Sequence, residues 1–319
     1  MPARTVEQLP EAPRYFPLEK GRYEVKPGLH PLGTDFGNGD WDRRVFQIDS
    51  DFPHYHQVKQ AARQEHLAKY VQTWELSPAV ERAVAEFMAQ RLAQEYPQWF
   101  HLETWINGWQ LRCDLTGDTL AFDREGRVQH PTYGSALDAL AMQVQEDVCV
   151  VCRAGDRHWV SAIHLCFPNH WAAQDKIGKT FAEVHAPVPG MAPLNQRGVA
   201  LVHAMIAGPP MVRFAWGLST DTELNHHPDR PAGRTFDPQH PQLYLRIERQ
   251  VIWGLPAVDA AVFTIRTYFR DVSVLRRDPR LCTLLQQAIR SMSPPSLAYK
   301  GLAAHWQEIL AWLEGGSAQ

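Results

Sequence analysis

The 319-residue sequence has no run of 18 consecutive apolar residues, so nothing in it predicts a membrane-spanning helix. Its first residues lack the apolar stretch and cleavage pattern of a signal peptide. It also lacks an excess of basic charge, with 32 Lys and Arg against 35 Asp and Glu and a net charge of −3. These absences predict a cytoplasmic protein with no nucleic-acid partner and no membrane partner.

Cysteine is scarce: the chain has five, an odd number, and they are scattered along the sequence. This favours reduced thiols over a disulfide framework. Cys149 and Cys152 have the C-x-x-C spacing of redox and zinc motifs, but they lie in an apolar, strand-like run. Side chains three positions apart on a strand point to opposite faces, so these two thiols are not expected to act together as a redox or zinc motif. They are expected to be core residues. The remaining cysteines are Cys113, Cys166 and Cys282.

Several common motifs are also missing: G-x-G-x-x-G, the P-loop, G-x-S-x-G and H-E-x-x-H. The usual nucleotide-binding, hydrolase and metalloprotease functions therefore have no support. What the chain does contain is 45% hydrophobic residues, 21% charged residues, 11 tryptophans and 24 prolines. That composition predicts a real core with many loops and aromatic-lined surfaces, and it argues against a helical bundle.

The order of elements predicts an α+β fold with an antiparallel sheet flanked by helices. An irregular segment is expected over about 1–53, followed by a helix over 54–70 and another that starts at the N-cap Ser77 and ends at Tyr96. Strands are expected over 118–123, 148–153, 158–167, 211–218, 243–252 and 258–269, the last two as a hairpin, and closing helices over 281–292 and 297–314. Because no linker divides the chain, residues 1–319 are expected to form one domain.

Most of the 15 histidines have ordinary explanations. His164 alternates with Ala162 and Cys166 on one face of a strand and is interpreted as a packed core residue. Four others lie beside prolines or charged residues and are expected to be surface or loop residues: His54, His56, His226 and His227.

His185 has a more unusual setting. Gly178 interrupts any long helix before it, and Pro187, Pro189 and Gly190 stiffen the backbone after it. A histidine held on a short rigid turn suits an axial ligand of a metal or haem iron. The alternative is a turn histidine that only makes hydrogen bonds.

Arg249 interrupts an otherwise apolar row along 243–251, and Arg266 lies in the middle of the next strand. A buried guanidinium needs a partner that accepts its hydrogen bonds. For Arg249 the sequence favours a structural ion pair with Glu146 or Asp147. The alternative interpretation is that Arg249 binds an anionic ligand such as a haem propionate.

Six segments, taken together and in order, carry a resemblance to a known family. They are Cys166–Trp171 (CFPNHW), Asp175–Gly178 (DKIG), Val184–Pro189 (VHAPVP), Arg213–Trp216 (RFAW), Arg246–Gln250 (RIERQ) and Val262–Tyr268 (VFTIRTY). In this order the chain resembles the α-subunit family of haem-dependent oxidative N-demethylases, from about Tyr15 to about Arg290.

The resemblance implies a PAS-like fold that binds haem b and uses dioxygen to oxidise a methylated amine, releasing formaldehyde. Electrons would come from NADPH through separate reductase subunits carrying flavin and an iron–sulfur cluster, and a tetrahydrofolate-linked subunit would capture formaldehyde. The sequence contains neither a ferredoxin-type cysteine pattern nor a dinucleotide fingerprint, which is consistent with electron supply by other chains.

The resemblance also implies roles for particular residues. His185 is the expected axial iron ligand, with His170 as its competitor. Lys176, Arg249 and Arg266 are expected near the propionates, Trp171 or Trp216 in the pocket wall, and Arg213 and Glu248 among the catalytic residues by motif alone.

One departure from the family pattern concerns substrate choice, because Ala215 stands where the family has asparagine. An alternative function is a PAS-type haem sensor or carrier that turns over no substrate, since a fold does not fix a function. A third is a structural relative that has lost haem.

Overall fold

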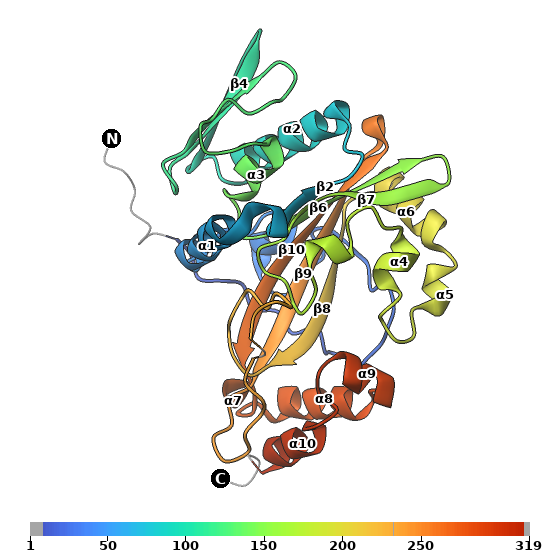
Figure 1. Cartoon of the computed structure of the whole chain (residues 1–319). Coiled ribbons are helices and arrows are strands. Elements are labelled where there is room, and N and C mark those ends of the chain that lie inside the picture. Colours follow the sequence, from blue (N-terminus) through green and yellow to red (C-terminus); the bar gives the residue numbers. More distant parts are fainter. Residues whose placement is uncertain (1–8, 232, 316–319) are drawn as a thin grey trace.

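The computed structural model describes residues 9–231 and 233–315 and shows an α+β fold (Figure 1). Seven antiparallel strands form the main sheet in the order β1-β8-β9-β10-β6-β7-β2, and three more form a small sheet in the order β3-β4-β5. The α+β prediction is confirmed. Residues 1–8, part of the segment without a signal-peptide pattern, lie outside the described residues.

The strands of the main sheet are β1 (His30–Pro31), β2 (Val71–Thr73), β6 (Asp147–Ala154), β7 (Arg157–His164), β8 (Met211–Ser219), β9 (Tyr244–Leu255) and β10 (Ala260–Asp271). Those of the small sheet are β3 (Phe100–Trp105), β4 (Gly108–Cys113) and β5 (Thr119–Asp123). The expected hairpin is confirmed, since β9 and β10 pair along their whole length on either side of a short connection.

The α-helices are α1 (Phe52–Tyr70), α2 (Pro78–Glu95), α3 (Ala136–Ala141), α4 (Phe181–His185), α5 (Ala192–Asn195), α6 (Gly198–Ala207), α7 (Val272–Leu275), α8 (Pro279–Arg290), α9 (Pro294–Tyr299) and α10 (Trp306–Glu314). Short 3-10 helices are η2 (Gly39–Arg43), η3 (Ala173–Asp175) and η4 (Pro256–Val258). Ser77 caps α2 as expected, because its hydroxyl accepts a hydrogen bond from the Val80 amide.

Two expectations need correction. The helix expected over 297–314 is two helices, α9 and α10, because Gly301 adopts a left-handed φ of 69° between them. The hairpin of β3 and β4 was not expected, although along β4 the buried Trp109, Leu111 and Cys113 alternate with polar residues. In the part of the chain that the structure describes, no helix combines the length and the apolar character needed to cross a membrane.

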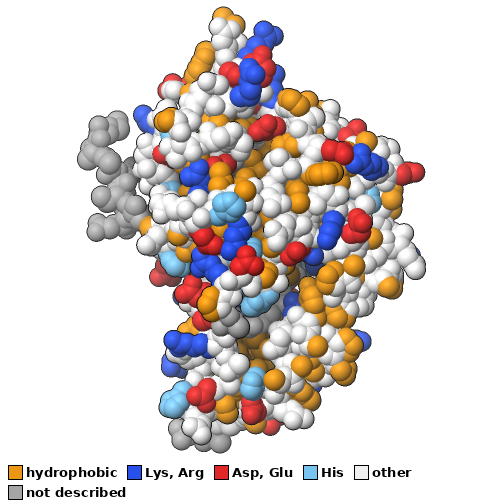
Figure 2. Space-filling model, viewed as in Figure 1, with side chains coloured by type: hydrophobic (Ala, Val, Ile, Leu, Met, Phe, Trp, Pro, Cys, Tyr) orange, Lys and Arg blue, Asp and Glu red, His pale blue; other side chains and the backbone are white. Residues whose placement is uncertain are grey.

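The main sheet is covered unevenly. One face packs on the large apolar cluster that includes α2, α3 and the 45–52 segment. On the other face, α6 lies directly against β9, since a Cβ on Gly254 would stand only 2.1 Å from the carbonyl oxygen of Ile206. Towards β8 this second face is open between α4 and α9, and the surface is hollowed there (Figures 1 and 2).

The cysteines behave as predicted. All five are free and buried. Cys149 belongs to the cluster beneath η3, whereas Cys152 belongs to the large cluster on the other side of the sheet. Their C-x-x-C spacing therefore brings no pair of thiols together.

Candidate functional site

The open stretch of the main sheet carries a row of polar side chains. The register of β8 and β9 places Arg213 opposite Gln250, Ala215 opposite Glu248 and Gly217 opposite Arg246. Alternate residues on paired strands share a face, so all of these point to the same side. We call Arg213, Arg246, Glu248 and Gln250, with His185 and Lys300 at their two sides, the candidate site.

Arg213 is the most unusual residue of the candidate site. Within residues 9–231 and 233–315 its side chain makes no hydrogen bond or ion pair within bonding distance, and its Nε is buried without a partner. Burial lowers the pKa of Arg213, and only the charge of nearby Glu248 opposes that shift. A buried cation without a partner is costly, so this position favours an anionic ligand.

Two neighbours on β9 are only partly satisfied. Nη2 of Arg246 donates to the carbonyl of Phe167 at 3.1 Å and to Oγ1 of Thr267 at 3.3 Å. Its Nε and Nη1 are buried and have no partner in the described chain, and the same holds for Oε1 of Gln250. Donors and acceptors in this state are available to a ligand.

Lys300, at the C-terminal end of α9, closes the other side, and the sequence analysis missed it. Its ammonium donates to the carbonyl of Trp216 at 2.7 Å, and its stem lies beside Gly217. Burial lowers its pKa, whereas the charge of Glu248 acts in the opposite direction. Nothing local in the sequence marks Lys300, because it reaches β8 from more than 80 positions away.

His185 is the last residue of α4, a helix that Thr180 and Glu183 begin with a capping box. Its Nδ1 lies 2.8 Å from the carbonyl oxygen of Phe181. This places the proton on Nδ1 and leaves Nε2 with a free lone pair. Burial, with the charges of Arg213 and Lys176, lowers the pKa of His185 and keeps the ring neutral.

Lys176 and Trp171 lie on the same side of the sheet as His185. Lys176 donates to the carbonyl of Val184 at 2.6 Å, and its ammonium lies 6.0 Å from the centre of the Trp171 ring. Trp171 packs in turn on the apolar cluster under η3. The two residues therefore support α4 from beneath.

His170, the competing ligand, is exposed and has a left-handed φ of 61°. The centre of its ring lies 5.1 Å from that of His226. The pKa of His170 is lowered by partial burial of the ring, then by the charge of His226 and that of Arg246. The expectation that His226 and His227 are surface residues is wrong. Both are buried, because the segment after β8 folds back onto the segment after β7, where the His226 amide donates to the carbonyl of Pro168.

Arg249 and Arg266 stand opposite each other in the register and point to the other face of the sheet. Arg266 forms a fully buried ion pair with Asp49 at 2.7 Å, and Arg249 donates to the carbonyl of Arg44 at 2.7 Å. Their expected place beside the propionates is not supported, because the sheet itself separates them from His185. The predicted ion pair of Arg249 with Glu146 or Asp147 is wrong, because among the described residues its guanidinium instead donates to the Arg44 carbonyl. Burial raises the pKa of Glu146 to about 7, and the charge of Arg249 is one of several that oppose this rise.

Taken together, the candidate site has three cations to one carboxylate, and beside them stands a neutral histidine with a free nitrogen. These features define a class: an α+β protein whose open sheet face suits an anionic, metal-bearing ligand. Comparison with known families agrees. The chain belongs to the family described as haem-dependent oxidative N-demethylase, alpha subunit-like, whose model matches residues 38–311.

Proposed function

We propose that the candidate site holds haem b and that the protein is the oxygen-activating subunit of an oxidative N-demethylase. The observation that carries the proposal is Arg213, a half-buried arginine whose Nε is buried with no partner in the described chain, on the face that His185 also borders. A haem propionate supplies the missing anion. The haem dependence in the family description supports the same cofactor.

The residues present fit this group. His185 would be the axial ligand through Nε2, since its Nδ1 is held by the Phe181 carbonyl. The cations available to two propionates are Arg213, Arg246 and Lys300. Their three positive charges outnumber the single negative charge of Glu248. When bound, the haem supplies dioxygen activation, and this chain supplies ligation, charge and access.

The proposed reaction consumes one N-methyl group, one O2, two electrons and two protons. One oxygen atom leaves in formaldehyde and the other in water, and the amine gains a hydrogen in place of its methyl group. The family description, an alpha subunit, implies other subunits. We infer that these include the NADPH-dependent reductase with its flavin and iron–sulfur cluster, and that a tetrahydrofolate-linked subunit receives the formaldehyde.

The finer description of the fold is part of the same proposal. We infer that the main sheet and the helices around it correspond to a PAS-like haem-binding domain in the cytoplasm, with the N-terminal segment and α8 to α10 as extensions. The antiparallel sheet supports this. Ala215, beside Arg213 on the open face, is the position from which substrate choice would differ within the family.

The test is an absorption spectrum of the purified protein, oxidised and then reduced with dithionite. We expect a strong Soret band in the wild type, its loss or shift in His185→Ala, and little change in His170→Ala. Formaldehyde release that requires NADPH, a reductase and a methylated amine would then establish the reaction. Absence of haem after reconstitution would overturn the proposal, and bound haem that is inert with every amine would favour the sensor.

A further inference from the structure

Three side chains of types that can bind a metal ion lie close together near Phe167, outside the candidate site. Asp147 begins β6, His164 ends β7, and Cys166 follows two residues later. One carboxylate oxygen, one ring nitrogen and the thiol sulfur all lie within 4.8 Å of one another. All three residues are buried, so this is an enclosed cluster and not a chance gathering of surface groups.

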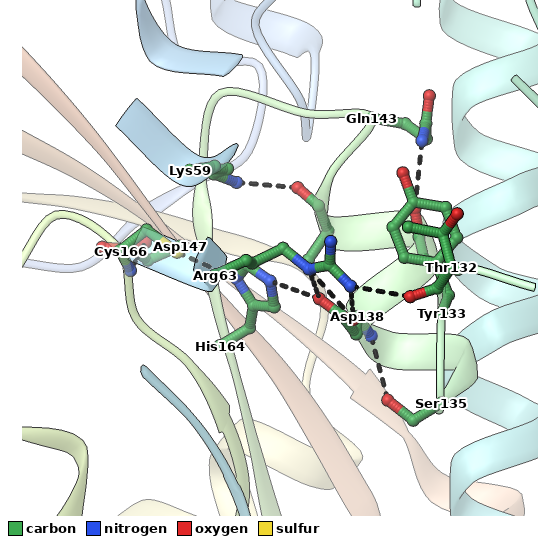
Figure 3. Close-up of polar contacts among 12 residues, drawn as sticks. Lys59, Arg63, Thr132, Tyr133, Ser135, Asp138, Gln143, Asp147, His164 and Cys166 are labelled. Atoms are coloured by element: carbon green, nitrogen blue, oxygen red, sulfur yellow. Dashed lines mark hydrogen bonds and ion pairs between the residues drawn. The ribbon is translucent and has the colours of Figure 1, made fainter. Parts of the chain in front are cut away.

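The protonation of His164 favours a ligand role. Its Nε2 lies 3.3 Å from Oδ1 of Asp138, which Arg63 binds through Nε and Nη2 (Figure 3). The carboxylate holds the proton on Nε2, so Nδ1 presents a lone pair to the cluster. A carboxylate behind a histidine is the usual outer support of a metal-bound imidazole.

The spacing of the donor atoms also fits a metal ion. Nδ1 of His164 and Sγ of Cys166 are 3.8 Å apart, at the long end of the range for a hydrogen bond to sulfur. Typical Zn–N and Zn–S bonds meeting at a tetrahedral angle place the two ligand atoms about 3.5 Å apart. A small shift of either side chain would bring both into contact with one ion.

The charges around the cluster are mixed. Asp147 already accepts hydrogen bonds from the amides of Cys166 and Phe167, which orient its carboxylate. The ammonium of Lys59 donates to the carbonyls of Ala141, Val144 and Glu146, and its positive charge also acts on Asp147 and Cys166. With the Cys166 thiol deprotonated, the cluster offers two negative charges to a divalent cation, and binding releases one proton.

We propose that Asp147, His164 and Cys166 bind a divalent metal ion of the zinc class, separate from any haem. The mixture of sulfur, nitrogen and oxygen ligands is typical of Zn²⁺. The ion anchors the start of the segment that carries Phe167, whose carbonyl binds Arg246, and then His170 and Trp171. Zinc in proteins is usually four-coordinate, so these three side chains leave one position for a water molecule.

The test uses the full chain, produced with added zinc, and elemental analysis that counts zinc and iron separately. We expect about one zinc per chain, and after exchange with Co²⁺ an intense near-ultraviolet band from the thiolate–cobalt bond. Cys166→Ser keeps the size of the side chain and should lose both signals. Cys152→Ala, another buried cysteine, is the matched control and should keep them.

Asp138→Asn tests the support of His164, and we expect metal affinity to fall about 10-fold to 100-fold. Circular dichroism of each variant shows whether it folds. The proposal is overturned if the folded wild type holds no stoichiometric zinc and gives no thiolate–cobalt band, or if Cys166→Ser keeps its zinc. Iron content reports haem independently, so failure of one proposal is not failure of the other.

Discussion

The two faces of β9 contrast sharply, although their residues alternate along one strand. On one face Arg249 lies beside Arg266, and each of the two arginines has a partner inside the protein for its Nη2 atom, although the Nε of each is buried without one. On the other face Arg246 keeps two nitrogen atoms free, and Arg213 on the neighbouring strand makes no bond to the described chain. A satisfied buried charge stabilises the fold, whereas an unsatisfied one indicates a missing ligand.

The largest expected effect comes from breaking the satisfied face. Arg266→Met leaves the Asp49 carboxylate buried without its cation, so the free energy of unfolding should fall by about 3–5 kcal/mol. Urea denaturation measures the loss. Arg157→Met removes an exposed pair with Glu75 and should leave the urea midpoint unchanged. Equal midpoints for the two variants would contradict the contrast.

A second comparison is between the covered and open parts of the candidate-site face. In Gly254→Ala the new Cβ meets the Ile206 carbonyl, so α6 must move and the free energy of unfolding should fall by about 3 kcal/mol. In Gly217→Ala the nearest atom is Cδ of Lys300 at 4.0 Å, and the change should stay within about 0.5 kcal/mol. Thermal unfolding of the two alanine variants compares them directly; similar losses would show that α6 does not pack on β9 as described.

The third prediction concerns ligand affinity. Arg213→Met should leave the haem-free protein as stable as the wild type or more stable, because it removes a buried charge without a partner. Haem affinity should fall at least about tenfold, or ~1.4 kcal/mol. Haem titration followed at the Soret band tests this. A variant that unfolds more easily yet binds haem normally would place Arg213 with the structural arginines.

The smallest effect on stability is expected from charged residues that lie on neither face of β9. The Lys69 ammonium, with Tyr70 and Arg230, lowers the pKa of Glu65 from its usual 4.5 to about 2. A carboxylate whose pKa is lower in the folded than in the unfolded state stabilises the folded protein at pH values above its unfolded pKa. This stabilisation is lost as pH falls from about 4.5 to about 2. The difference in urea midpoint between the wild type and Glu65→Gln should therefore shrink over that range. A constant difference would mean that Glu65 contributes through contacts alone.

The alternation of polar and apolar residues predicted most of the main sheet, because β6, β7, β9 and β10 each bury much of their length. It also predicted the short rigid turn at His185, where glycine and prolines limit the helix to α4. The β3–β4 hairpin was missed although β4 shows the same alternation, while its partner β3 is exposed over its last three residues.

For the arginines, the sequence by itself determined that Arg246, Arg249 and Arg266 would lie in paired strands, with Arg246 and Arg249 on opposite faces. It determined a family resemblance that the family match confirmed. Only the tertiary structure decided which face each arginine joins. Partners come from distant segments, Asp49 for Arg266 and Arg44 for Arg249, and Lys300 likewise comes from a distant segment to lie near Arg213. Burial and pairing depend on how these segments pack, and no local pattern encodes that packing.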